Sequence, residues 1–89
     1  MQATVEISLN PLTEDYDAVV TAFCERLKQY NGIKVEVNGL STQLFGDYDR
    51  LMEILQHEVK GILEEHKAVF HLKMAKGILT RERLPMSLK

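Results

Sequence analysis

Residues 38–47 read Asn-Gly-Leu-Ser-Thr-Gln-Leu-Phe-Gly-Asp, and they lie between two halves of the chain that share one pattern, a strand followed by a helix. The Asn-Gly pair separates two runs of alternating apolar and polar residues, which predicts a tight hairpin turn. Polar side chains at Ser41, Thr42 and Gln43 then follow where an apolar run would normally cross a sheet. This composition indicates that water, a ligand or a partner covers one face of the strand.

The half before this stretch predicts one strand and one helix. Apolar residues alternate with polar ones from Ala3 to Leu9, which is the period of a strand with one buried face. Pro11 is expected to end this strand, and Thr13 to cap the helix that follows. Apolar residues then recur at helical spacing as far as Tyr30.

The second half repeats the pattern. Alternating residues predict strands over 33–37, 40–45 and 69–75. Between the last two, apolar residues at helical spacing predict a second helix, with Asp47 or Asp49 as its N-terminal cap.

The order of these elements is strand, helix, strand, strand, helix, strand. Two split βαβ units interlock in this order as a ferredoxin-like α+β sandwich. Right-handed crossovers then predict a four-stranded antiparallel sheet in the order 4-1-3-2, with both helices on one face. We expect a single domain over residues 1–78 and a C-terminal tail over 79–89 that is flexible or docks on a neighbouring subunit.

Length and composition narrow the class of protein. The chain has 89 residues, the length of one domain, and its 45% hydrophobic content argues against disorder. A net charge of −2 without a basic run argues against nucleic acid and anionic membranes as partners. Cys24 is the single cysteine, which excludes an internal disulfide and a CxxC site. No targeting segment or membrane span is visible, so we expect a cytoplasmic protein.

Three short segments carry a family resemblance. Ile7-Ser-Leu-Asn-Pro-Leu12 follows an alternating strand, Tyr16 lies in the first turn of the first helix, and Ser41-Thr42 and Gly46-Asp47 precede the second helix. Together these segments resemble the thiamine/hydroxymethylpyrimidine-binding family (the YkoF-like group), over about Ala3 to Lys76. The signature positions that the resemblance implies are Ser8, Pro11, Leu12, Thr42, Gly46 and Asp47.

The resemblance implies both an assembly and a ligand. Members of the family have the ferredoxin-like fold and associate through their sheets into dimers or higher oligomers. Some bind thiamine or its pyrimidine moiety without converting it chemically. Carried to this chain, the resemblance implies a homodimer or homotetramer formed through sheet faces.

A thiamine site needs groups that recognise two rings. Amide, hydroxyl or carboxylate groups can read the aminopyrimidine, and an aromatic face or a carboxylate suits the cationic thiazolium. Candidate ligand-binding residues near the central strands are Glu6, Ser8, Tyr16, Asn38, Ser41, Thr42, Gln43 and Phe45. Three alternatives stay open: locally bonded hydroxyls on the strands, Tyr16 as a core residue, and Phe45 as an interface residue. No catalytic residue, metal site or required cofactor is expected.

The sequence therefore predicts a non-catalytic small-molecule binding protein. Its ligand would be thiamine or hydroxymethylpyrimidine, held at or near a sheet-mediated oligomer interface. The alternative is an oligomerisation or regulatory domain without such a ligand. An acylphosphatase of this topology would need an arginine in the loop after the first strand, and residues 10–15 contain none. An RNA-binding domain would need several aromatic and basic residues on the central strands.

Overall fold

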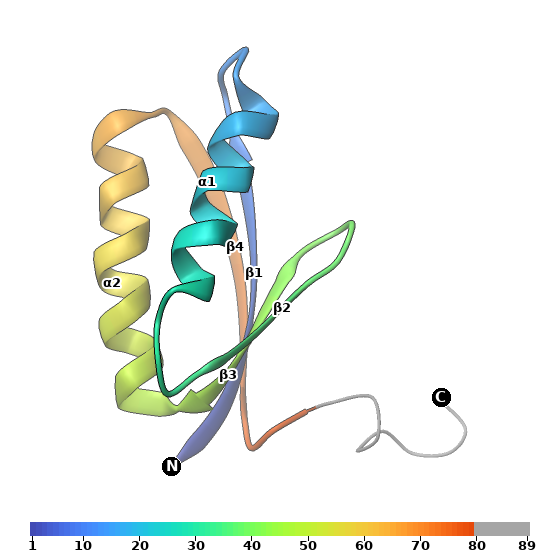
Figure 1. Ribbon diagram of the computed structural model, residues 1–89, viewed down its shortest axis with the longest axis vertical. Helices are drawn as coiled ribbons and strands as arrows, with labels where there is room; N and C mark the ends of the chain where they lie inside the picture. The colour runs from blue at the N-terminus through green and yellow to red at the C-terminus, as the bar shows by residue number, and fades with distance from the viewer. Residues whose placement is uncertain (80–89) are drawn as a thin grey trace.

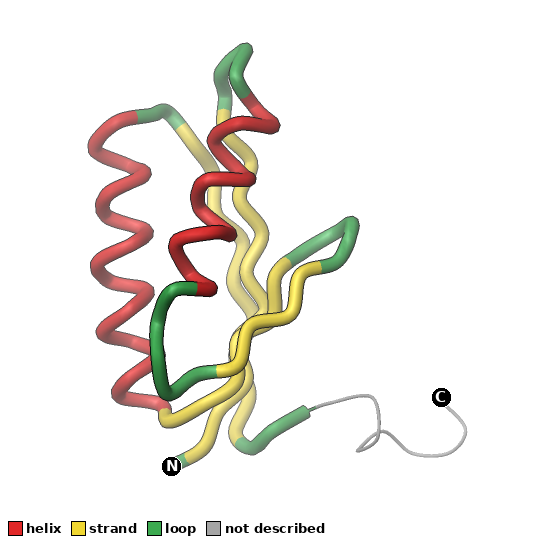
Figure 2. The backbone as a smooth tube through the Cα atoms, in the orientation of Figure 1, coloured by secondary structure: helices red, strands yellow, loops and turns green. Residues whose placement is uncertain are grey.

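The computed structural model describes residues 1–79, and it confirms the predicted ferredoxin-like α+β fold (Figure 1). The elements are β1 (Gln2–Pro11), α1 (Tyr16–Lys28), β2 (Lys34–Val37), β3 (Thr42–Asp47), α2 (Tyr48–Glu65) and β4 (Ala68–Lys76). All strand pairs are antiparallel, and the spatial order β2-β3-β1-β4 is the predicted one. Both helices cover the same face of the sheet (Figure 2). No helix within residues 1–79 is long and apolar enough to cross a membrane.

The core lies between this sheet face and the two helices. Odd-numbered side chains of β1, from Ala3 to Leu9, point into it, as the alternation predicts. On the helix side, the core contains Phe23 and Leu27 of α1 and Leu51 of α2. Phe23 also meets the Phe70 ring of β4 edge to face, with 5.6 Å between the ring centroids.

β1 does not end before Pro11, as the sequence suggested, but includes it. Its pairing with β4 continues to Pro11 opposite Ala68, whereas its pairing with β3 already stops at Ile7 opposite Thr42. Proline lacks an N–H group, so it is tolerated in a strand where that side of the backbone has no partner. The end of β1 therefore lies at a vacant edge, where proline costs no hydrogen bond.

The β2–β3 turn is displaced from its predicted position. β3 begins at Thr42 and not at Leu40, whose side chain is 91% exposed. The Asn38 N–H donates to the Ser41 carbonyl (3.0 Å), and the Asn38 Oδ1 accepts from the amides of Leu40 (2.9 Å) and Ser41 (3.0 Å). Asparagine side chains compete in this way with the sheet for backbone amides. Gly39 and Leu40 therefore form the tip of the turn.

The helix starts agree only in part with the sequence. Asp47 caps α2, because its Oδ2 accepts from the Arg50 amide (3.3 Å), while its Oδ1 lies 3.2 Å from the N-terminal ammonium. The bond from Arg50, with that of the ammonium group, lowers the pKa of Asp47. Thr13 does not cap α1, which begins at Tyr16. Its hydroxyl instead accepts from the Asp15 amide (2.9 Å), in a turn before the helix.

A buried carboxylate ties the two helices together. Glu58 of α2 is 6% exposed and accepts from Arg26 Nε (2.7 Å) and the Tyr30 hydroxyl (2.6 Å). Burial acts to raise the pKa of Glu58, but the hydrogen bonds from Tyr30 and Arg26 outweigh it and hold the pKa below its ordinary value. The bond to Glu58, together with burial, raises the pKa of Tyr30.

The face of the sheet opposite the helices is mostly polar, but one end of it is covered. After β4 the chain turns at Gly77, whose φ is +87°, and crosses Thr4 on this open face. The Thr4 hydroxyl donates to the Gly77 carbonyl (2.8 Å) and accepts from the Leu79 amide (2.9 Å). Phe45, which is opposite Thr4 in the sheet, is 4% exposed. The predicted tail lies outside the described residues, apart from Leu79.

Candidate functional site

A hollow of about 240 Å³ opens at the end of the sheet where β3 begins. Residues 7–9 of β1 form its floor, the first half of α1 one wall, and the β2–β3 turn the other. Figure 2 shows this turn projecting beyond the paired part of the sheet. The lining residues are Ile7, Ser8, Leu9, Tyr16, Asp17, Val20, Phe23, Cys24 and the segment 37–42.

The hollow brings together five of the eight candidate residues. They are Ser8, Tyr16, Asn38, Ser41 and Thr42, which come from three separate segments of the chain. Thr42 lies on the helix side of the sheet at 5% exposure. Its hydroxyl is 3.4 Å from Sγ of Cys24 in α1, and both residues line the hollow. Tyr16 is 45% exposed at the rim, so the alternative that placed it in the core is wrong.

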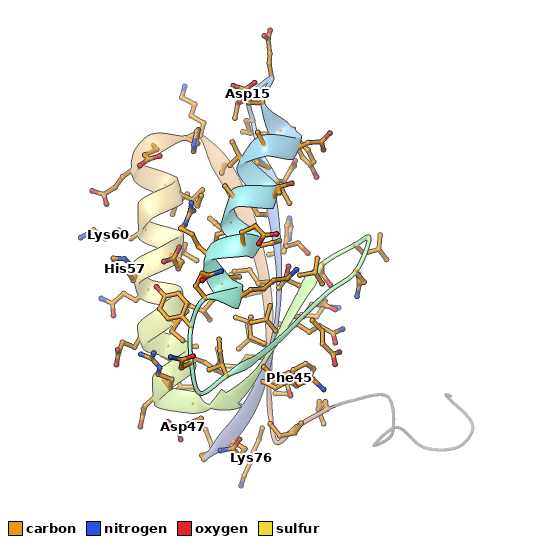
Figure 3. The ribbon with its side chains drawn as sticks, viewed as in Figure 1. Asp15, Phe45, Asp47, His57, Lys60 and Lys76 are labelled. Atoms are coloured by element: carbon orange, nitrogen blue, oxygen red, sulfur yellow. The ribbon has the colours of Figure 1, made fainter. Side chains whose placement is uncertain are left out.

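The other three candidates lie elsewhere. Glu6 and Gln43 are opposite each other on the open face, where they line a second, shallower hollow with Thr4 and Lys73. Phe45 is buried on that same face and lines neither hollow. Figure 3 places it toward the opposite end of the molecule from Asp15, which directly precedes α1.

Several lining residues were not singled out in the sequence. Val20 and Phe23 belong to the apolar stripe of α1, and this spacing reads as ordinary core. Asp17 lies in the first turn of α1, where a negative charge is favourable. Of the described residues that line the hollow, it alone is charged, so the hollow favours a neutral or cationic ligand.

Among residues 1–79, none bonds to the main chain of Leu9 on the hollow side. Even-numbered residues of β1 bond to the β4 side, as shown by Gly77 N–H to the Gln2 carbonyl and Leu12 N–H to the Lys67 carbonyl, both 2.8 Å. Odd-numbered residues therefore bond to the β3 side, as the Met1 carbonyl does with Tyr48 N–H (2.8 Å). The pairing with β3 ends at Ile7, two residues before Leu9, and none of the described turn residues bonds to the Leu9 main chain.

Other titratable clusters offer less. Within residues 1–79, no group of three His, Cys, Asp or Glu side chains is arranged to hold a metal ion. Glu36, on the open face, pairs with Lys34 of the same strand (3.1 Å). The hollow beside α1 is thus the best candidate site.

Comparison with known proteins supports the fold. No protein-family model matches the chain, and no curated protein matches its sequence. A solved structure described as a candidate thiamine biosynthesis/salvage protein, from Thermotoga maritima, is similar with a TM-score of 0.82 and 21% identity over 94% of this chain and 96% of that one. A Streptococcus pneumoniae protein gives 0.79 and 24% over 89% and 90%. A hypothetical protein from Methanocaldococcus jannascii gives 0.73 and 27% over 92% and 90%.

Proposed function

We propose that the hollow beside α1 binds an aminopyrimidine, either hydroxymethylpyrimidine or the pyrimidine ring of thiamine, without chemical conversion. The observation that carries the proposal is the meeting of Ser8, Tyr16, Asn38, Ser41 and Thr42 at one hollow. Their hydroxyl, amide and aromatic groups suit the two rings of thiamine. The structural similarity to a candidate thiamine biosynthesis/salvage protein supports the same class of ligand.

The size and chemistry of the hollow suit one ring better than two. At about 240 Å³ it is smaller than the roughly 300–1,000 Å³ of typical ligand pockets. A pyrimidine would therefore fill the interior, between the apolar side chains of Val20 and Phe23 and the hydroxyls of Ser41 and Thr42. The thiazolium of thiamine would extend to the rim, where the Tyr16 ring and the Asp17 carboxylate suit a flat cation.

Two neighbouring residues on opposite faces of β3 provide a matched test of this placement. Thr42→Val keeps the shape of the side chain but removes a hydroxyl from the hollow, and we expect hydroxymethylpyrimidine to bind about 5- to 10-fold more weakly. Gln43→Leu alters the open face and leaves the affinity unchanged. Isothermal titration calorimetry of both variants and the wild type measures this difference. Binding that is weakened by Gln43→Leu but not by Thr42→Val would place the ligand on the open face of the sheet and contradict the proposed site.

We also propose that a second copy of the chain is the partner of an exposed apolar groove between α2 and β4. Leu63, Leu72 and Met74 line it with exposed fractions of 51%, 46% and 47%. α2 packs over β1 and β3, so the β4 side chains are only half covered. This position differs from the open face, whose aromatic residue, Phe45, is already buried within one chain.

The outer edge of β4 supports a copy of itself as the occupant. β4 pairs with β1 without interruption from Ala68 to Lys76 and contains no proline, and no strand within residues 1–79 lies on its other side. Its odd-numbered residues bond to β1, so the main chain of Phe70, Leu72 and Met74 points outward. Antiparallel pairing of two such edges about Leu72 is self-complementary and brings the two apolar grooves together.

Leu72→Lys is therefore expected to convert an associated species into monomers, because it places a charge at the centre of the paired edges. Light scattering behind size-exclusion chromatography, at the same concentration for each protein, measures the mass. Leu40→Lys is the control, since Leu40 is 91% exposed at the β2–β3 turn, away from the groove. A monomeric wild type, or a Leu72→Lys variant of unchanged mass, would contradict the proposed interface.

A further inference from the structure

Within residues 1–79, the edge of β1 beside the hollow is left without a hydrogen-bond partner at Leu9. The Leu9 residue is only 8% exposed, and its N–H and C=O face the side where β3 has ended. Unpaired N–H and C=O groups along the edge of a strand are a ready template for a hydrogen-bonding partner. A donor and an acceptor left free at the floor of a hollow therefore indicate a site that a polar guest completes.

Two features of the sequence keep this edge free. If β3 began two residues earlier, Leu40 would lie opposite Leu9 and would bond to its main chain. The Asn38 Oδ1 accepts from the Leu40 amide instead (2.9 Å), and the Leu40 carbonyl accepts from the Ser8 hydroxyl (3.5 Å), so neither group bonds to the Leu9 main chain. The next residue on the same side of β1 is Pro11, which has no N–H to offer. The vacancy is thus built by Asn38 and tolerated by Pro11.

One peptide edge presents an N–H donor and a C=O acceptor side by side. An aminopyrimidine presents the complementary pair, a ring nitrogen that accepts and an adjacent amine that donates. We infer that the main chain of Leu9 reads this amine and ring-nitrogen edge, with the ring lying between α1 and the β2–β3 turn. The inference rests on the proposed function and adds the part of the ligand that is recognised and the group that recognises it.

Amide hydrogen exchange of the full chain, followed by NMR, tests the inference at a single atom. In the free protein we expect the Leu9 amide to exchange at least about 100-fold faster than those of Val5 and Ile7, which pair with β3. The probe is 4-amino-5-hydroxymethyl-2-methylpyrimidine at saturation. We expect it to slow exchange at Leu9 by at least about 10-fold more than at Ile7.

The control ligand is the same pyrimidine with hydrogen in place of the amine. It should bind at least about 10-fold more weakly and give Leu9 less protection, because it lacks the donor for the Leu9 carbonyl. Slow exchange at Leu9 in the free protein would show that the edge is not free and would overturn the inference. Binding of the aminopyrimidine without protection of Leu9 would overturn it while leaving the proposed function intact. If the aminopyrimidine does not bind at all, both fall.

Discussion

Replacing Val20 by tryptophan is expected to weaken hydroxymethylpyrimidine binding by at least about 100-fold, because the indole would occupy the place of the ligand ring. Val20 is half-buried on α1 and lines the hollow. The space available is about 240 Å³, so the larger side chain can enter it without displacing the core. Calorimetric titration measures the loss of affinity. Thermal unfolding of the same variant checks that the fold is kept.

Thr21→Trp is the matched control for this substitution. Thr21 is the next residue on α1, but it is exposed and does not line the hollow. We expect this variant to bind as the wild type does. Equal losses for Thr21→Trp and Val20→Trp would mean that the helix and not the hollow is being perturbed. Unchanged binding by a folded Val20→Trp variant would exclude the hollow as the site.

Replacing Glu58 by alanine is expected to lower the free energy of unfolding by about 2–3 kcal/mol, since it leaves Arg26 and the Tyr30 hydroxyl without their shared acceptor. The Arg26 side chain is 46% exposed, so water can replace its lost hydrogen bond. Most of the loss in stability therefore comes from removing the buried Glu58 side chain and its bond with Tyr30. Urea denaturation measures the change. Glu64→Ala, an exposed carboxylate on the same helix, should have little effect. A Glu58→Ala variant as stable as Glu64→Ala would show that the hydrogen bonds of Glu58 contribute nothing to the stability of the fold.

The same carboxylate makes stability depend on pH. Its pKa in the folded protein lies below the ordinary value of 4.5, so the unfolded chain takes up a proton first as the pH falls. The contribution of Glu58 is therefore fully present above pH 4.5 and is lost as the pH falls through the lower, folded pKa. The stability difference between the wild type and Glu58→Gln should shrink over this acid range. A difference that is independent of pH there would contradict the assigned role.

The topology could be predicted because each element has its own local signal. Alternation from Ala3 to Leu9 and helical spacing after Tyr16 follow from the periods of strand and helix, and these periods do not depend on tertiary context. The ends of the strands could not be predicted in the same way. Whether Pro11 ends β1 depends on whether β3 lies beside it. β3 begins only at Thr42, because the Asn38 side chain accepts a hydrogen bond from the Leu40 amide.

The candidate site was partly visible for a similar reason. Hydroxyl and amide side chains at Ser8, Asn38 and Ser41 stand out in a small apolar domain, and they line one hollow. Thr42 and Gln43 are adjacent in sequence but point to opposite sheet faces, and of the two only Thr42 lines the hollow. The free main chain of Leu9 could not be predicted, because it depends on where the pairing of β1 with β3 stops, and Asn38 and Pro11 do not reveal that register by themselves.

The central claim is that a flat heterocycle occupies the hollow between β1, α1 and the β2–β3 turn. Chemical-shift mapping of the ¹⁵N-labelled protein with hydroxymethylpyrimidine tests it most directly. The account predicts saturable shifts at Leu9, Tyr16, Ser41 and Thr42, with Glu6 and Lys73 on the open face unmoved. Shifts centred on Glu6 and Lys73, or none at millimolar ligand, would contradict it.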